Sequence, residues 1–128
     1  MRVLHVITSL KKASGASTFC GALCNALVRL GHVVTVAVPE ARLYDEGYAL
    51  SPNVKLESFE RMMTSDETYD VIHIHGIWEY ANHKASMMAR GRGVPYVIST
   101  HGSTAPWAMN HRWWKKALFW YLYFRRDL

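Results

Sequence analysis

The segment YDVIHIHGIW, residues 69–78, decides the fold of this chain. Its centre, with Val71, Ile72 and Ile74, is a short apolar run of β-branched residues, which predicts a buried strand. The six residues from His73 to Trp78 then contain two histidines, a glycine and a tryptophan. Polar and aromatic side chains are therefore concentrated at the point where a buried strand ends.

Other segments of the chain alternate between the same kind of strand and helices. Four more β-branched runs predict strands at residues 2–8, 32–38, 54–59 and 94–100. Helices are expected after a small-residue loop at 9–18, with Ser17 or Thr18 as N-cap and Gly31 as the end, and then at 60–68, 80–93 and 111–126. Long connections are expected at 39–53 and 101–110. This alternation predicts an α/β, Rossmann-like parallel sheet with helices on both faces.

Composition and charge exclude several classes of protein. The chain has 128 residues, enough for one domain with a core, and a formal charge of +5. Residues 1–111 carry 10 basic and 9 acidic side chains, a net of +1, whereas residues 112–128 carry 5 and 1, a net of +4. The excess thus belongs to the tail and does not indicate nucleic-acid binding. No secretory signal is visible, and the apolar run ALFWYLYF has eight residues where about 20 are needed to span a membrane.

Three of the predicted strands end in loops that carry candidate binding groups. Parallel strands have their carboxyl ends at one edge of the sheet, and ligands of open α/β sheets bind beyond that edge. The loops there are Ser14-Gly15-Ala16-Ser17, His75-Gly76 and His101-Gly102, with Trp78 and Trp107 nearby.

Each of these features has a structural alternative. The small-residue loop favours phosphate or sugar contact through helix-terminal N–H groups, or is a plain strand-to-helix turn. The histidines contact a ligand or cap loop carbonyls, and the tryptophans stack on a sugar or cover the core.

A metal site is not expected. His73 and His75 share one strand face, but no third ligand has a convincing spacing, so His73 is expected to pack within the sheet. Cys20 and Cys24 are expected in the core of the first helix, and their small number suggests a reducing cytoplasm.

The tail, residues 112–126, combines aromatic residues with cations and has no acidic residue. Such a helix favours contact with an anionic membrane surface, and packing between protein layers is the alternative. The candidate membrane-facing cations are Arg112, Lys115, Lys116, Arg125 and Arg126.

Taken in order, the segments MRVLHVITSL…ASGAST, LVRLGHVVTV, YDVIHIHGIW and GVPYVISTHGSTAPWA resemble the amino-terminal, acceptor-side half of bacterial family-4 (group 1) GT-B glycosyltransferases. The resemblance covers essentially all 128 residues. It implies a retaining enzyme that moves a sugar from a nucleotide-sugar donor to a glycan or lipid-linked acceptor, without a metal or other cofactor. It implies that Gly15, Ala16 and Ser17 approach the donor phosphates and that His101 is catalytic. His75, Gly76, Trp78, Gly102 and Trp107 would line the cleft on the acceptor side.

Two departures from the family qualify this expectation. Ala16 stands where the family often has a second glycine, and its methyl group would narrow the approach to phosphate. The family's carboxy-terminal donor domain, with two glutamates eight positions apart, has no counterpart in residues 1–128. We therefore expect this chain alone to be inactive, and to work with a donor domain in cis or in trans. It would be either half of a full enzyme or a non-catalytic acceptor-binding and membrane-docking subunit of a split one. A stand-alone flavodoxin-like binding module is the third possibility. The expected location is the cytoplasm, at the periphery of the inner face of the cell membrane.

Overall fold

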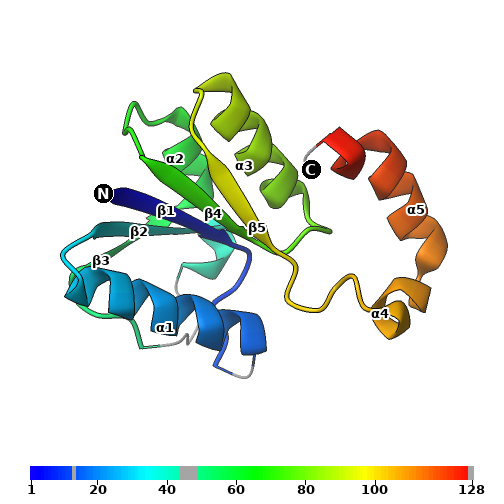
Figure 1. Cartoon of the computed structure of the whole chain (residues 1–128), viewed down its shortest axis with the longest axis horizontal. Coiled ribbons are helices and arrows are strands. Elements are labelled where there is room, and N and C mark those ends of the chain that lie inside the picture. Colours follow the sequence, from blue (N-terminus) through cyan, green and yellow to red (C-terminus); the bar gives the residue numbers. More distant parts are fainter. Residues whose placement is uncertain (13, 44–48, 127–128) are drawn as a thin grey trace.

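The computed structural model describes residues 1–12, 14–43 and 49–126, and Figure 1 shows their arrangement. The strands are β1 (Arg2–Ile7), β2 (Val33–Val38), β3 (Val54–Ser58), β4 (Val71–His75) and β5 (Tyr96–Ser99). The α-helices are α1 (Gly15–Arg29), α2 (Phe59–Thr64), α3 (Tyr80–Gly91), α4 (Pro106–Asn110) and α5 (Trp113–Leu122). Two 3₁₀ turns, η1 (Glu40–Arg42) and η2 (Phe124–Arg126), complete the order.

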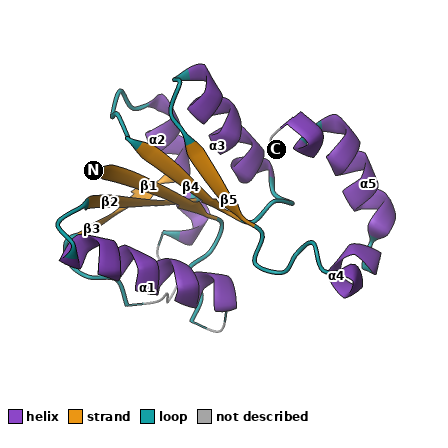
Figure 2. Cartoon of the chain, in the orientation of Figure 1, coloured by secondary structure: helices purple, strands orange, loops and turns teal. Residues whose placement is uncertain are grey.

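The five strands form one parallel sheet in the order β3-β2-β1-β4-β5. Helix α1 lies on one face, and α2 and α3 lie on the other (Figure 2). The predicted α/β fold with helices on both faces is therefore confirmed. Because β1, β4 and β5 are parallel neighbours in the sheet, the loops that follow them open at the same edge.

Alternating side chains of the strands supply two apolar clusters, one for each face of the sheet. The cluster under α2 and α3 contains Leu4, Val6, Phe59, Met62, Tyr69, Ile72, Ile74, Ala85, Met88 and Ala89, among others. The cluster under α1 contains Ile7, Leu10, Cys20, Cys24, Val34, Val36, Val38 and Val54. Both cysteines are buried free thiols in this second cluster, in agreement with their predicted place in the core.

The first helix begins earlier than predicted. Its N-cap is Ser14, not Ser17 or Thr18, so Gly15, Ala16 and Ser17 form the first turn of α1. The Ser17 hydroxyl instead donates a hydrogen bond to the carbonyl oxygen of Ser9 at 2.9 Å, which ties the loop to the helix. Gly31 has a φ of 85° and ends the helix as predicted.

Later elements differ from the predictions mainly at their ends. The helix expected at 60–68 is α2, and it stops at Thr64. Residues 101–110, expected as a loop, contain the short helix α4, which has Pro106 at its start. The single helix expected over 111–126 is divided into α5 and η2. Within the predicted connection 39–53, residues 44–48 lie outside the described residues, and η1 precedes them.

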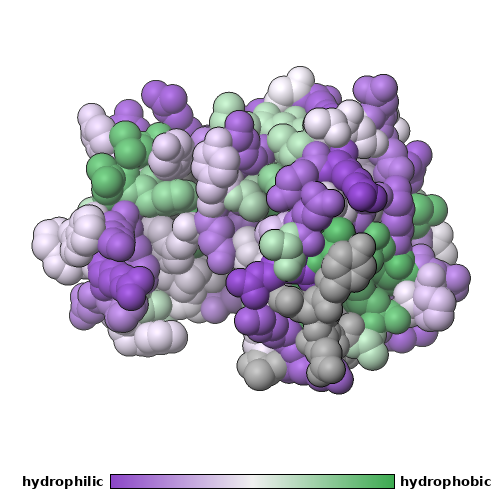
Figure 3. Space-filling model, turned by 180° about the vertical axis from the view of Figure 1, so that it is seen from behind, coloured by the Kyte–Doolittle hydropathy of each residue, from purple (hydrophilic) through white to green (hydrophobic). Residues whose placement is uncertain are grey.

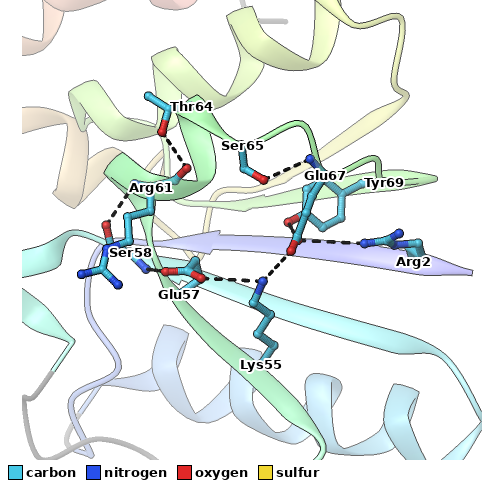
Figure 4. Close-up of polar contacts among 9 residues, drawn as sticks. All are labelled: Arg2, Lys55, Glu57, Ser58, Arg61, Thr64, Ser65, Glu67 and Tyr69. Carbon is cyan, nitrogen blue, oxygen red and sulfur yellow. Dashed lines mark hydrogen bonds and ion pairs between the residues drawn. The ribbon is translucent and has the colours of Figure 1, made fainter.

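The amino edge of the sheet is held by an ionic network, shown in Figure 4. Glu67 accepts hydrogen bonds from Lys55 at 2.6 Å and from the Tyr69 hydroxyl at 2.8 Å, and Arg2 lies 4.0 Å away. The Lys55 hydrogen bond is the main cause that lowers the pKa of Glu67. These contacts join the starts of β1 and β3 to the segment that leads into β4. The carboxyl edge of the sheet takes no part in this network.

Candidate functional site

A cavity of about 270 Å³ lies at the carboxyl edge of the sheet. Three loops line it, each from a different strand, so the predicted convergence is present in the structure. The lining residues are Ile7, Thr8, Ser9, Ser14, Ala16, His75, Gly76, Ile77, Trp78, Glu79, Thr100, His101 and Ser103. The cavity therefore connects the start of α1 with both histidine loops.

The loops after β4 and β5 are fastened to each other. The Gly76 amide donates to the carbonyl oxygen of Ser99 at 2.8 Å, and the Trp78 indole N–H donates to that of Ser103 at 3.1 Å. Ser103 also donates through its hydroxyl to the carbonyl oxygen of Thr100. The indole of Trp78 is thus held at the cavity wall by a hydrogen bond that fixes its orientation.

Backbone conformation at the ends of β4 and β5 explains the two His-Gly pairs. Gly76 has a φ of 101°, and a Cβ added there would lie 3.0 Å from the Asn82 amide nitrogen. His101 itself has a φ of 48° and Gly102 a φ of 77°, so the chain turns through two left-handed residues after β5. A non-glycine residue in this region is uncommon and is found at functional sites. This turn carries the His101 ring back toward His75.

Three histidines form a hydrogen-bonded row from the core to the cavity. His5 Nδ1 lies 2.9 Å from His75 Nε2, and His75 Nδ1 lies 2.9 Å from His101 Nε2. The His75 and His101 rings are stacked, 5.2 Å apart and 13° from parallel. His5 and His75 are buried, whereas His101 is exposed. The fourth histidine of the cluster, His73, pairs its Nε2 with the Ser99 hydroxyl at 2.7 Å, in agreement with its predicted packing in the sheet.

Loss of contact with water favours the neutral form of His73, His75 and His101. Desolvation is the main cause that lowers the pKa of His75 to about 2 and that of His73 to about 4, and neighbouring histidines lower both further. Desolvation also lowers the pKa of His101. A neutral imidazole has one donor and one acceptor nitrogen, so the row can orient a ligand group through either.

Two groups of side chains have metal-like spacing. They are His5 with Cys20 and Cys24, and His5 with His73 and His75, each set with its ligand atoms within 4.8 Å. In the second set the ring nitrogens of His5 and His75 that face each other already share a hydrogen bond. In the first set the Cys20–Cys24 contact, with sulfurs 3.9 Å apart, raises the pKa of Cys20 and lowers that of Cys24. The expectation that no metal is needed stays a prediction.

The structure brings some of the predicted site residues together and leaves others apart. Five of them line the cavity: Ala16, His75, Gly76, Trp78 and His101. Gly15 and Ser17 lie beside it in the first turn of α1, and Ser17 is fully buried. Gly102 and Trp107 do not line it, and Trp107 is 77% exposed on α4. The roles of all these residues stay predictions.

Sequence reasoning missed three residues that shape the site. His5, inside the strand predicted at residues 2–8, continues the imidazole row into β1. Asn82 is buried in α3, and its amide lies 3.5 Å from the carbonyl oxygen of His75. Phe19 meets the His101 ring edge-on at 5.4 Å. The contact of His5 with His75 depends on the register in which β1 pairs with β4, and no local sequence pattern encodes that register. The available signal was the histidine in the neighbouring strand β1.

Residues 44–126 match a family model described as a glycosyl transferase 4-like domain, which is more than half of the chain. The chain belongs to the glycosyl transferase 4-like domain family. Comparison with curated proteins gave no match. Glycosyl transferase domains act in general on a sugar donor and an acceptor.

The tail of this glycosyl transferase 4-like domain packs on the cavity wall with one side only. Phe119 meets the Trp78 ring at 6.3 Å, and the Lys116 ammonium lies 5.4 Å from the same ring and donates to the carbonyl oxygen of Ala108. Tyr123 packs on His83 of α3 at 4.7 Å. The other side chains of α5 are mostly exposed, including Trp113 at 66% and Tyr121 at 68%. Among the described residues, none of the helices is both long and apolar enough to cross a membrane.

Proposed function

We propose that this domain is the acceptor-side half of a retaining glycosyltransferase that uses a nucleotide-sugar donor and a glycan or lipid-linked acceptor. The observation that carries the proposal is the single cavity that joins the start of α1 to His75, Trp78 and His101. In the reaction, the bond from the anomeric carbon to the diphosphate oxygen breaks. A bond to the acceptor hydroxyl oxygen forms on the same face, and the hydroxyl proton passes to the leaving phosphate.

The first turn of α1 supports the phosphate part of this proposal. The N-cap Ser14 makes no side-chain capping hydrogen bond, and the first turn has no acidic residue. The helix start therefore presents amide N–H groups and a partial positive charge toward the cavity, which favours a diphosphate. Charge that develops on the leaving phosphate would be stabilised there as transfer proceeds.

The imidazole row supports the sugar part of the proposal. His101 is exposed at the cavity and is backed by a buried neutral partner, so its outer nitrogen is available to a sugar hydroxyl. The indole of Trp78 offers an apolar wall of the kind on which sugar rings pack. A metal or other cofactor has no part in the proposed reaction.

The outer side of α4 and α5 supports a peripheral position at an anionic membrane surface. Exposed aromatic and aliphatic residues there lie among exposed cations, and Figure 3 shows hydrophobic and hydrophilic side chains side by side where α5 lies, at the left. The exposed cations are Arg112, Lys115, Arg125 and Arg126, whereas Lys116 is engaged by Ala108 and Trp78. A lipid-linked acceptor would be met at such a surface, and the free thiols of Cys20 and Cys24 agree with its cytoplasmic side.

Native mass spectrometry of the chain with nucleotide sugars and with lipid-linked glycans tests the proposal. An acceptor-side half retains the glycan in preference to the nucleotide sugar. His101→Ala lowers that retention, whereas His111→Ala, which changes an exposed histidine outside the cavity, leaves it unchanged. Stronger retention of the nucleotide sugar, or equal loss in both variants, would contradict the acceptor-side assignment. Retention of the glycan by a chain that recruits a separate donor-binding chain would favour the split enzyme.

A further inference from the structure

The number of hydrogen atoms on the ring nitrogens of His5, His75 and His101 restricts the tautomers that the three rings can adopt together. Each N···N contact of 2.9 Å, from His5 to His75 and from His75 to His101, can hold one hydrogen. A neutral imidazole carries one N–H, so three neutral rings carry three hydrogens. Two of them occupy the bridges. The third must therefore sit at one end of the row, on Nε2 of His5 or on Nδ1 of His101.

The surroundings of the inner end decide between these two places. Among the described residues, His5 Nε2 has no hydrogen-bond partner, and the side chain is fully buried. A buried N–H without an acceptor is rarer in proteins than an under-used acceptor. The Cys24 sulfur, within 4.8 Å of a His5 ring nitrogen, is only a weak acceptor for a buried N–H, whereas its thiol can donate to a bare nitrogen. The third hydrogen therefore belongs at the outer end.

We propose that His5, His75 and His101 form one relay of linked tautomers, in which buried His5 fixes His101 as an Nδ1–H donor toward the cavity. His5 Nδ1–H donates to His75, and His75 Nδ1–H donates to His101. In this arrangement His5 is a positioning residue, because it acts on the ligand only through two other rings. Resting on the proposed function, the relay assigns the ligand group at His101: an oxygen that accepts a hydrogen bond, from a sugar hydroxyl or a phosphate.

The relay also couples protonation of His101 to the state of His5. A protonated His101 donates from both nitrogens, so His75 must then accept at Nδ1 and hold its hydrogen on Nε2. His5 in turn must accept at Nδ1, which places an N–H on its buried Nε2. Protonation at the cavity therefore reverses both bridges and places a buried N–H on His5 that has only weak sulfur acceptors beside it. This reversal opposes protonation of His101, in the same direction as its desolvation.

Other titratable or charged groups surround the relay on every side. His73 of β4 stacks on His75 at 4.1 Å, and Cys20 and Cys24 face His5 from α1. Glu79 lies on the cavity rim, and Lys116 of α5 lies over Trp78 in the cavity wall. His73 bonds Ser99 and stays outside the row, so it provides an internal comparison.

Nitrogen-15 NMR of the histidine rings, recorded on the unliganded chain through a pH titration, tests the relay. Above neutral pH we expect His5, His75 and His101 all to carry hydrogen on Nδ1. As His101 takes up a proton, the hydrogen on His5 is expected to move from Nδ1 to Nε2. A bare Nδ1 on His101 above neutral pH would overturn the proposal, and so would His5 nitrogens that do not change as His101 titrates.

The variant His5→Asn provides a second test. In His5→Asn, a side-chain amide near the position of His5 Nδ1 can either donate a hydrogen bond to His75 or accept one from it. Reversal of this hydrogen bond then no longer places an N–H on a buried imidazole Nε2. The pKa of His101 is expected to rise toward its ordinary value in His5→Asn and to stay unchanged in the control His111→Asn. An unmoved His101 titration in folded His5→Asn would contradict the relay, and if this variant does not fold, the wild-type spectra decide. Neither measurement includes a ligand, so a failure of the relay and a failure of the proposed sugar chemistry are seen separately.

Discussion

At the scale of single residues, Gly76 shapes the carboxyl edge of the sheet. Its φ of 101° disfavours any other residue, and an added Cβ would lie 3.0 Å from Asn82. Gly76→Ala is expected to lower the free energy of unfolding by about 1–2 kcal/mol, because a left-handed non-glycine residue costs roughly that amount. Urea unfolding measures the change. Gly91→Ala is the matched control, since no atom lies within 4 Å of its added Cβ, and it should not destabilise. Equal effects of the two changes would refute this account of Gly76.

Buried His75 and half-buried His73 make stability depend on pH. The folded pKa values of His75 and His73, about 2 and about 4, lie below the ordinary value of 6.5, so the unfolded chain binds more protons between these values. Stability is therefore full above about pH 6.5 and falls as the pH is lowered, by up to about 1.4 kcal/mol per pH unit for each histidine. Urea unfolding at pH 7.5 and 5 should show this loss, and His73→Gln should reduce the slope. A slope that His73→Gln leaves unaltered would count against a neutral, half-buried His73.

The sequence allowed prediction of only part of the site at this scale. His75 and His101 could be placed at the carboxyl edge, because each is followed by glycine after a clear strand. The link from His75 to His5 could not be predicted, since it depends on the register in which β1 pairs with β4. The contact of Asn82 with the β4–α3 turn depends on where α3 packs, which its own pattern does not specify.

At the scale of elements, strands were predicted better than helix ends. Five β-branched runs are sufficient to identify five strands, because buried parallel strands have a composition that turns and helices lack. The start of α1 was misplaced because several small polar residues in succession can all act as N-caps. There Ser17 bonds back to Ser9 and Ser14 takes the cap position, a choice that tertiary contacts make.

Helix α5 carries the prediction that concerns a membrane. Each cation near an anionic surface contributes about 1 kcal/mol, so Lys115→Gln is expected to weaken vesicle binding about fivefold. Sedimentation with phosphatidylglycerol vesicles measures this change. Lys115 is exposed, and Arg29→Gln removes the same charge from the exposed end of α1 as a control. Equal weakening by both substitutions, or no binding by the unaltered chain, would leave α5 without a role at lipid.

At the scale of the whole molecule, the two edges of the sheet are built from different chemistry. The amino edge is closed by ion pairs among Arg2, Lys55 and Glu67, with Tyr69 bonded to the same carboxylate (Figure 4). The carboxyl edge holds neutral imidazoles, the uncapped start of α1 and the cavity. This division follows from parallel strands in a single sheet, and the proposed sugar and phosphate site uses only the carboxyl edge.

The central claim, that the carboxyl-edge cavity is the sugar site, is tested most directly by mapping backbone amide shifts while a glycan acceptor is added. The account predicts that the shifts concentrate at residues 75–79 and 100–103. A second cavity of about 320 Å³, lined by Asp66, Tyr69 and Arg92 among others, is the internal comparison, and its amides should not move. Shifts that gather at this second cavity, or that spare His75 and His101 at saturating glycan, would contradict the claim.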